Sequence, residues 1–193
     1  DIRATLDKAG MKYLTAGTTK GLGGPTVLVP DSANADSPFA DKKVREAVEY
    51  AIDRKAVENL GRGEWEAPFQ VAPSRSWAYN PALESRYRKF DPKKAKDLLS
   101  AAGFPNGFKT RIYTASTATR DQLTPVVQYL KDVGIEAPVE LVTLPKFTEL
   151  QTTGWRSSLM AAGLPQGTAP FVGPIAINWW SGQWYPSLNK SVK

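Results

Sequence analysis

The sequence contains no cysteine and no histidine among its 193 residues. The lack of cysteine excludes thiolate nucleophiles and disulfides, and the lack of histidine excludes Ser–His–Asp triads and imidazole ligands for zinc or nickel. We therefore expect no metal site, no cofactor and no imidazole acid–base chemistry. A chain without cysteine is compatible with a protein outside the cytoplasm that uses no disulfides.

Long apolar runs are also missing. No stretch of about eighteen apolar residues predicts a membrane-spanning helix. The N-terminal sequence DIRATLDKAGMKYL lacks a charged region followed by an apolar one, so it predicts no signal peptide. The first residue is Asp1 and not methionine, which is consistent with a processed chain or an excised segment.

Charge of either sign is not concentrated in one place, although the net charge is +6. Lysine and arginine are spread along the chain with acids between them, and the densest basic run, Arg86–Lys89, is short. We interpret these charges as solvated surface and expect no nucleic-acid partner. The hydrophobic fraction of 41% is that of an ordinary globular domain.

The strongest periodic pattern lies in PFADKKVREAVEYAIDRKAVENL, residues Pro38–Leu60. Its apolar residues recur at helical spacing, with charged residues on the opposite face. Asp41 and Asp53 are placed to cap two successive helices, the second running from Arg54 to Leu60. We expect the apolar stripe to pack against a sheet; its members are Val44, Ala47, Val48, Ala51 and Ile52.

A second helix is predicted in DPKKAKDLLSAAG, residues Asp91–Gly103. Asp91 is placed as N-cap, Pro92 occupies the first helical position, and Gly103 suits the left-handed position after the helix. The predicted buried stripe is Ala95, Leu98, Leu99 and Ala102.

The remaining segments alternate between strands and helices, which predicts an α/β lobe with a partly parallel, mixed sheet flanked by helices. Pro125 is expected in the first turn of its helix, because a proline there costs no hydrogen bond. The predicted strands are 11–16, 25–30, 108–114, 139–144 and 158–162, and the predicted helices are 1–9, 120–133 and 145–153.

Two of these patterns resemble the family 5 extracellular solute-binding proteins, which are receptors for peptides, nickel complexes and some oligosaccharides in ABC import systems. The first is PF-x-D-x-x-VR-x-A-x-x-x-AIDR, at residues 38–54, and the second is DPKKAKDLLSAAGFPNGF, at Asp91–Phe108. The resemblance extends from about Thr26 to Trp180.

The resemblance implies one lobe of a two-lobed, periplasmic-binding-protein-like receptor. We expect residues 1–193 to form a single α/β lobe of the C-terminal type and to be a fragment of a longer chain. The implied partners are the missing second lobe, a small solute and ABC permease subunits in the membrane. The implied location is periplasmic or extracellular, with membrane association through the full-length receptor or its permease.

Ligands of open α/β sheets bind beyond the carboxyl ends of the strands. This places Thr114–Arg120 and Gly163–Pro174 beside the expected cleft. In peptide-binding relatives the second of these loops resembles G-W-x-x-D-x-x-DP, whose acid can pair with a peptide amino group. The corresponding Gly163–Thr168 has no acid, which argues against recognition of a peptide through its α-amino group.

Aromatic and amide side chains remain as candidate ligand contacts, and this combination suits sugars. The alternative for each of the six tryptophans is packing in the core or between lobes. Arg120 can clamp a ligand carboxylate or can be an ordinary helix-surface arginine. The candidate ligand-binding residues are Trp77, Tyr79, Arg120, Gln166, Trp179 and Trp180, and further aromatics and amides lie at Asn178, Gln183, Trp184 and Tyr185.

We therefore expect the substrate-binding component of an ABC transporter, which captures a peptide or oligosaccharide-like solute for import. The alternative is a non-transport interaction or structural module with the same fold. Glu64 and Glu66 beside Trp65 are the carboxylate pair that glycoside hydrolysis would need. They read equally well as a polar turn, and with no positioned catalytic constellation in the sequence we expect no enzyme.

Overall fold

The computed structural model describes residues 5, 8–10, 26–61, 69–70, 79–86 and 88–163. A four-stranded sheet has the order β1-β6-β3-β5, in which β1 is antiparallel to β6 and the other neighbours are parallel. A parallel pair, β2-β4, forms a second sheet. The strands are β1 (Thr26–Pro30), β2 (Phe108–Lys109), β3 (Ile112–Thr114), β4 (Ile135–Glu136), β5 (Val139–Leu141) and β6 (Leu159–Gly163).

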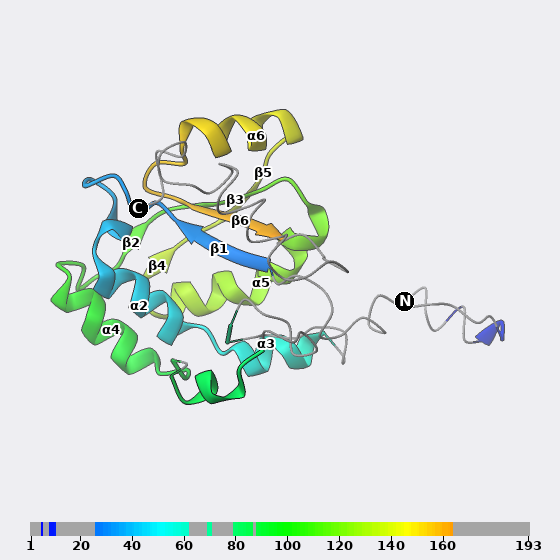
Figure 1. Cartoon of the computed structure of the whole chain (residues 1–193), viewed down its shortest axis with the longest axis horizontal. Coiled ribbons are helices and arrows are strands. Elements are labelled where there is room, and N and C mark those ends of the chain that lie inside the picture. The colour runs from blue at the N-terminus through cyan, green and yellow to red at the C-terminus, as the bar shows by residue number, and fades with distance from the viewer. Residues whose placement is uncertain are drawn as a thin grey trace.

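Helices cover both faces of the larger sheet (Figure 1). On one face lie α2 (Lys42–Ala51), α4 (Pro92–Ala101) and α5 (Thr117–Asp132), and on the other lies α6 (Leu144–Thr153). The large core between the sheet and the three helices contains Phe39, Leu99, Ile112 and Leu130, whereas Trp155 and Met160 form a smaller core with α6. The predicted α/β lobe with a mixed sheet is confirmed.

The break in the helical pattern at Asp53 is confirmed. Asp41 Oδ1 accepts a hydrogen bond from the Lys43 backbone at 2.7 Å and caps α2, and Asp53 Oδ1 accepts one from Ala56 at 2.9 Å and caps α3 (Arg54–Leu60). Val44 and its helical neighbours Ala47 and Ala51 are buried. The stripe packs chiefly against α4, although we expected a sheet there.

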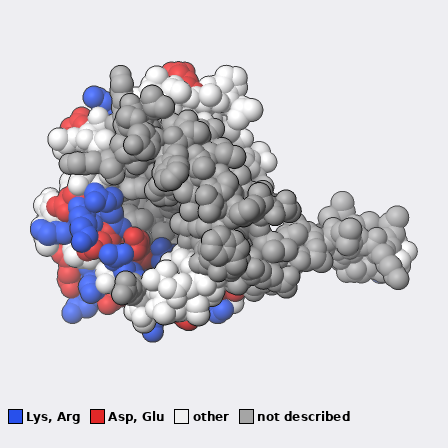
Figure 2. All heavy atoms as spheres, viewed as in Figure 1, with Lys and Arg blue, Asp and Glu red and all other residues white. Residues whose placement is uncertain are grey.

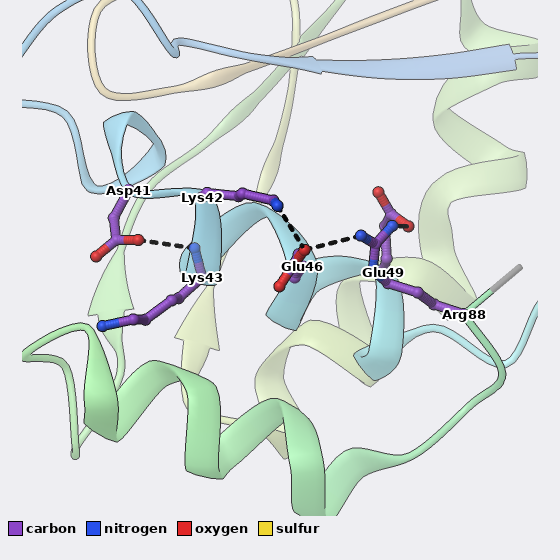
Figure 3. A network of polar contacts seen from close by, with 6 residues as sticks. All are labelled: Asp41, Lys42, Lys43, Glu46, Glu49 and Arg88. Atoms are coloured by element: carbon purple, nitrogen blue, oxygen red, sulfur yellow. Dashed lines mark hydrogen bonds and ion pairs between the residues drawn. The ribbon is translucent and has the colours of Figure 1, made fainter. Parts of the chain in front are cut away.

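Two arginines that look like surface charges in the sequence hold the α2 region together. Arg45 Nη1 donates to the carbonyl oxygens of Phe39 and Ala40 at 2.7 and 2.9 Å, and so satisfies the end of the short η2 helix (Pro38–Ala40). Arg88 donates to Glu49 at 2.7 Å and to Glu46 at 2.8 Å (Figure 3). Its hydrogen bond to Glu49 is the main cause of its raised pKa.

The helix predicted after Asp91 is confirmed with its caps. Asp91 Oδ1 accepts from the Lys94 backbone at 2.9 Å, Pro92 begins α4, and Gly103 has a φ of +89°. The α2–α4 surface carries both signs of charge side by side (Figure 2). Lys42 and Glu46 form one of its ion pairs, at 3.6 Å.

The predicted strand 108–114 is interrupted in the structure. Its two parts are β2, which pairs with β4, and β3, which pairs with β5. Pro138 lies in the segment between β4 and β5. Proline has no backbone N–H to donate, so the ladder cannot run through that position. Pro138 still accepts a hydrogen bond from Ile112 at 2.9 Å.

The predicted start of the fifth helix was wrong by three residues. Ser116 Oγ accepts from the Thr119 backbone at 3.2 Å and caps α5, so the helix begins at Thr117. Pro125 therefore lies inside the helix and not in its first turn. The described partner of β1 is β6; the predicted strand 11–16 lies outside the described residues.

Candidate functional site

Three parallel strands end at one edge of the sheet, which we call the carboxyl edge. It is formed by the last residues of β3, β5 and β6, namely Thr114, Leu141 and Gly163. Thr26, the first residue of β1, is the register partner of Gly163. β1 therefore begins, and β6 ends, side by side at this edge.

Hydroxyl groups fix the junction between β3 and α5. The Thr114 side chain is buried, and its Oγ1 accepts from the Ser116 backbone at 3.2 Å. Ser116 in turn caps α5, so two successive hydroxyls define where the helix begins. This geometry leaves Thr117 exposed on the first turn, at the carboxyl edge.

Arg120, a predicted ligand contact, lies on the first turn of α5. Its side chain is 47% exposed, and Nε and Nη2 both donate to Asp121 Oδ1, at 3.1 and 3.0 Å. The adjacent carboxylate holds the guanidinium at the carboxyl edge without burying it. A ligand carboxylate would share or replace Asp121 as its partner.

A side-chain hydrogen bond joins β1 to α5 at this edge. Thr26 Oγ1 donates to Gln122 Oε1 at 3.2 Å. Gln122 is half-buried and lies in the second turn of α5. The α5 side of the carboxyl edge is therefore rich in hydroxyl, amide and guanidinium groups.

The α6 side of the same edge is apolar. Leu141 is 43% exposed and Leu144 is 69% exposed. Thr143 occupies the N-cap position of α6 but makes no side-chain capping bond, and Pro145 removes one of the first backbone donors. The carboxyl edge thus offers a polar surface beside α5 and an apolar surface beside α6, so it can contact both polar and apolar groups of a ligand.

The structure describes two of the six predicted ligand contacts. Arg120 lies at the carboxyl edge, whereas Tyr79 is half-buried and packs against Phe69 with ring centroids 5.7 Å apart. Within the described ranges no hydrogen bond, ion pair or ring contact joins Tyr79 to Arg120. The predicted contacts Trp77, Gln166, Trp179 and Trp180 lie outside the described residues, as do Glu64, Trp65, Glu66 and the loop after Gly163.

Sequence reasoning missed Thr26, Gln122, Thr143 and Leu144. The signal for Thr143 and Leu144 was the same as for Arg120, since each follows the end of a parallel strand. Among the described residues, no group of three acidic, cysteine or histidine side chains is placed to hold a metal ion. No helix in those ranges has the length and apolar character needed to cross a membrane.

An α/β lobe with a mixed sheet and helices on both of its faces has the fold of a periplasmic binding protein lobe. The model of the bacterial extracellular solute-binding proteins, family 5 Middle, matches residues 4–183. The chain belongs to the family 5 bacterial extracellular solute-binding proteins.

Curated and solved relatives agree with this assignment. Glutathione-binding protein GsiB of Shigella flexneri is 39% identical over 106 residues, which is 53% of this chain and 20% of that protein. DppA of Helicobacter pylori, solved with the peptide STSA, has a TM-score of 0.68 at 22% identity over 91% of this chain and 36% of its own.

A Thermotoga maritima periplasmic oligopeptide-binding protein, solved with mannohexaose, has a TM-score of 0.67 at 15% identity over 93% of this chain and 40% of its own. At these identities the solved structures support the fold alone. The chain spans about a fifth of the length of GsiB and well under half of the two solved chains.

Proposed function

We propose that this chain forms one wall of the ligand cleft in the substrate-binding component of an ABC importer. The receptor captures a peptide or an oligosaccharide-like solute and passes it to permease subunits in the membrane. The observation that carries the proposal is the carboxyl edge, where β3, β5 and β6 end beside the first turns of α5 and α6.

The connectivity of the sheet supports a cleft at this edge. Because Thr26 and Gly163 are register partners, β1 begins and β6 ends at one place on this edge. A second lobe joined to the chain at both of these points would close over the carboxyl edge and shield the ligand from water. The remaining cleft wall would come from that lobe, and the chain by itself corresponds to a single lobe of the C-terminal type.

The names of the relatives support two ligand classes. GsiB is named for glutathione, the DppA structure holds a peptide, and the Thermotoga structure holds mannohexaose. All three ligands carry many neutral oxygen acceptors, which suit the hydroxyl and amide groups of Thr117 and Gln122. We assign the receptor a binding role without catalysis, in the periplasm or outside the cell.

Nuclear magnetic resonance tests this proposal, because it detects weak binding and locates it. The isotope-labelled chain is titrated with the peptide STSA and separately with mannohexaose, each to millimolar concentration. We expect backbone shift changes at Thr117, Arg120 and Thr143, and none at Asp31 or Ser157 on the opposite edge. Unchanged spectra of the probes over hours would agree with a protein that does not turn them over.

A mutation of Arg120 tests whether this predicted ligand contact takes part in binding. Arg120→Ala is expected to weaken STSA, which has a carboxylate, about tenfold, and to leave mannohexaose unchanged. Arg156→Ala is the control, because Arg156 is an exposed arginine beside Ser157 at the opposite edge. Absence of shift changes with both probes would overturn the proposed function; equal binding by both variants would remove Arg120 from the site.

A further inference from the structure

The hydrogen bond between Thr26 and Gln122 does more than join two elements. Thr26 Oγ1 donates to the amide oxygen of Gln122 at 3.2 Å, across 96 positions of sequence. An oxygen that accepts this bond fixes which way the amide faces. The Nε2 group, with its two N–H donors, therefore points away from Thr26 Oγ1.

These amide donors lack an acceptor within the described part of the chain: no hydrogen bond from Gln122 Nε2 to another described residue is present. The neighbouring cationic group is already engaged, because Arg120 donates through Nε and Nη2 to Asp121. Gln128, on the same helix, differs in this respect, since its Nε2 donates to Asp132 at 2.7 Å. Gln122 thus has, at the carboxyl edge, an oriented amide donor that has no acceptor among the described residues.

We infer that Gln122 is a ligand-binding residue of the cleft and that Thr26 is its positioning residue. The Nε2 group donates to a neutral oxygen acceptor of the ligand, either a peptide carbonyl or a sugar hydroxyl. Thr26 holds the amide in the donating orientation. This inference rests on the proposed function and adds to it a residue that sets the chemistry of the ligand.

Gln122→Glu isolates the donor. Glutamate has the same shape and still accepts from Thr26, but at neutral pH it has no N–H and its charge repels an acceptor oxygen. We expect binding of the preferred probe, STSA or mannohexaose, to weaken about tenfold or more. Gln128→Glu is the charge control, because it adds the same charge to the same helix away from the edge. It also removes the Gln128–Asp132 hydrogen bond, so its melting temperature is measured alongside, and its affinity is expected to equal that of the wild type.

Thr26→Val tests the positioning role. Valine keeps the shape of threonine and removes the hydroxyl donor, so the Gln122 amide loses its fixed orientation. We expect binding about threefold to fivefold weaker, with an unchanged melting temperature. In the wild type the two side-chain N–H signals of Gln122 should be well separated and should move on titration; in Thr26→Val they should lie closer together before ligand is added.

The two probes distinguish a peptide ligand from a sugar ligand, and the variants distinguish the inference about Gln122 from the proposed function. A response of Gln122 to STSA identifies a peptide as the ligand class, and a response to mannohexaose identifies a sugar. Probe binding that is unaffected by Gln122→Glu, with silent Gln122 side-chain signals, would overturn the inference and leave the proposed function standing. No binding of either probe by the wild-type chain would overturn both.

Discussion

The two edges of the sheet are built in opposite ways. At the amino edge, where β3, β5 and β6 begin, Asp31 is 0% exposed and accepts from the Ser157 backbone at 2.6 Å and from Asn34 at 2.7 Å. Thr110 Oγ1 donates to the Ser157 carbonyl at 2.7 Å. At the carboxyl edge Thr117, Leu141 and Leu144 are exposed. Thr143 leaves α6 without a side-chain cap.

If the carboxyl edge is the binding surface that we propose, the difference separates stability from function. The amino edge even holds Ser157 at a φ of +53°, a conformation that a residue with a Cβ adopts at a cost of about 1–2 kcal/mol. The Asp31 and Thr110 hydrogen bonds offset that cost and fix the turn before β6. The carboxyl edge instead keeps donors, hydroxyls and leucines available, as a binding surface requires.

The largest effect is expected where the backbone packs most closely. Gly107 has a φ of +73°, and an added Cβ would overlap the carbonyl oxygen of Gly134, which accepts from Phe108 at 3.2 Å. These glycines precede β2 and β4, on the amino side of β3 and β5. Gly107→Ala is expected to lower the free energy of unfolding by more than about 4 kcal/mol or to prevent folding, as measured by urea denaturation.

Gly103→Ala is the control for this prediction. Gly103 also has a positive φ, of +89°, but nothing lies within 4 Å of an added Cβ. Its replacement therefore adds backbone strain alone, about 1–2 kcal/mol. Equal losses in the two variants would show that the close approach of Gly107 to Gly134 contributes nothing to the stability of the amino edge.

Asp31→Asn tests the polar part of the amino edge. Asparagine keeps the shape but loses the charge, and one of its two terminal positions becomes a donor that faces the Ser157 or Asn34 N–H group. We expect a loss of about 1.5–3 kcal/mol in the free energy of unfolding, the range for hydrogen bonds to a charged group. Asp36→Asn, at an exposed position, should change it by less than about 0.5 kcal/mol.

Local sequence signals predicted most of the scaffold. Asp41, Asp53 and Asp91 were correct as caps, because an N-cap acts on a backbone group only two or three residues away. The predicted start of α5 was wrong because Pro125 was expected in the first turn, whereas the Ser116 cap places the start at Thr117. A proline inside a helix removes one hydrogen bond, and the packing of α5 on the core outweighs that loss.

The candidate site was less predictable, because its contacts join distant parts of the chain. Arg120 was found from its place after a strand, but its pairing with Asp121 was not expected. Gln122 and Thr26 carry no motif, and their contact depends on the pairing of β1 with β6. Arg45 was interpreted as a surface charge, although its guanidinium serves two backbone carbonyls.

The smallest effect is a gain, and it concerns the carboxyl edge. Thr143 has extended backbone angles, φ −67° and ψ 154°, which suit an N-cap, yet its side chain does not cap α6. Thr143→Asp is expected to supply the missing acceptor and a favourable charge at the helix N-terminus, and so to raise the free energy of unfolding by about 0.5–1 kcal/mol. Ser116→Ala, which removes the existing cap of α5, should lower it by about 1 kcal/mol. If Thr143→Asp is more stable and also binds STSA more weakly, the missing side-chain cap of α6 favours ligand binding at the expense of stability. If Thr143→Asp is no more stable than the wild type, the N-terminus of α6 does not lack a stabilising cap.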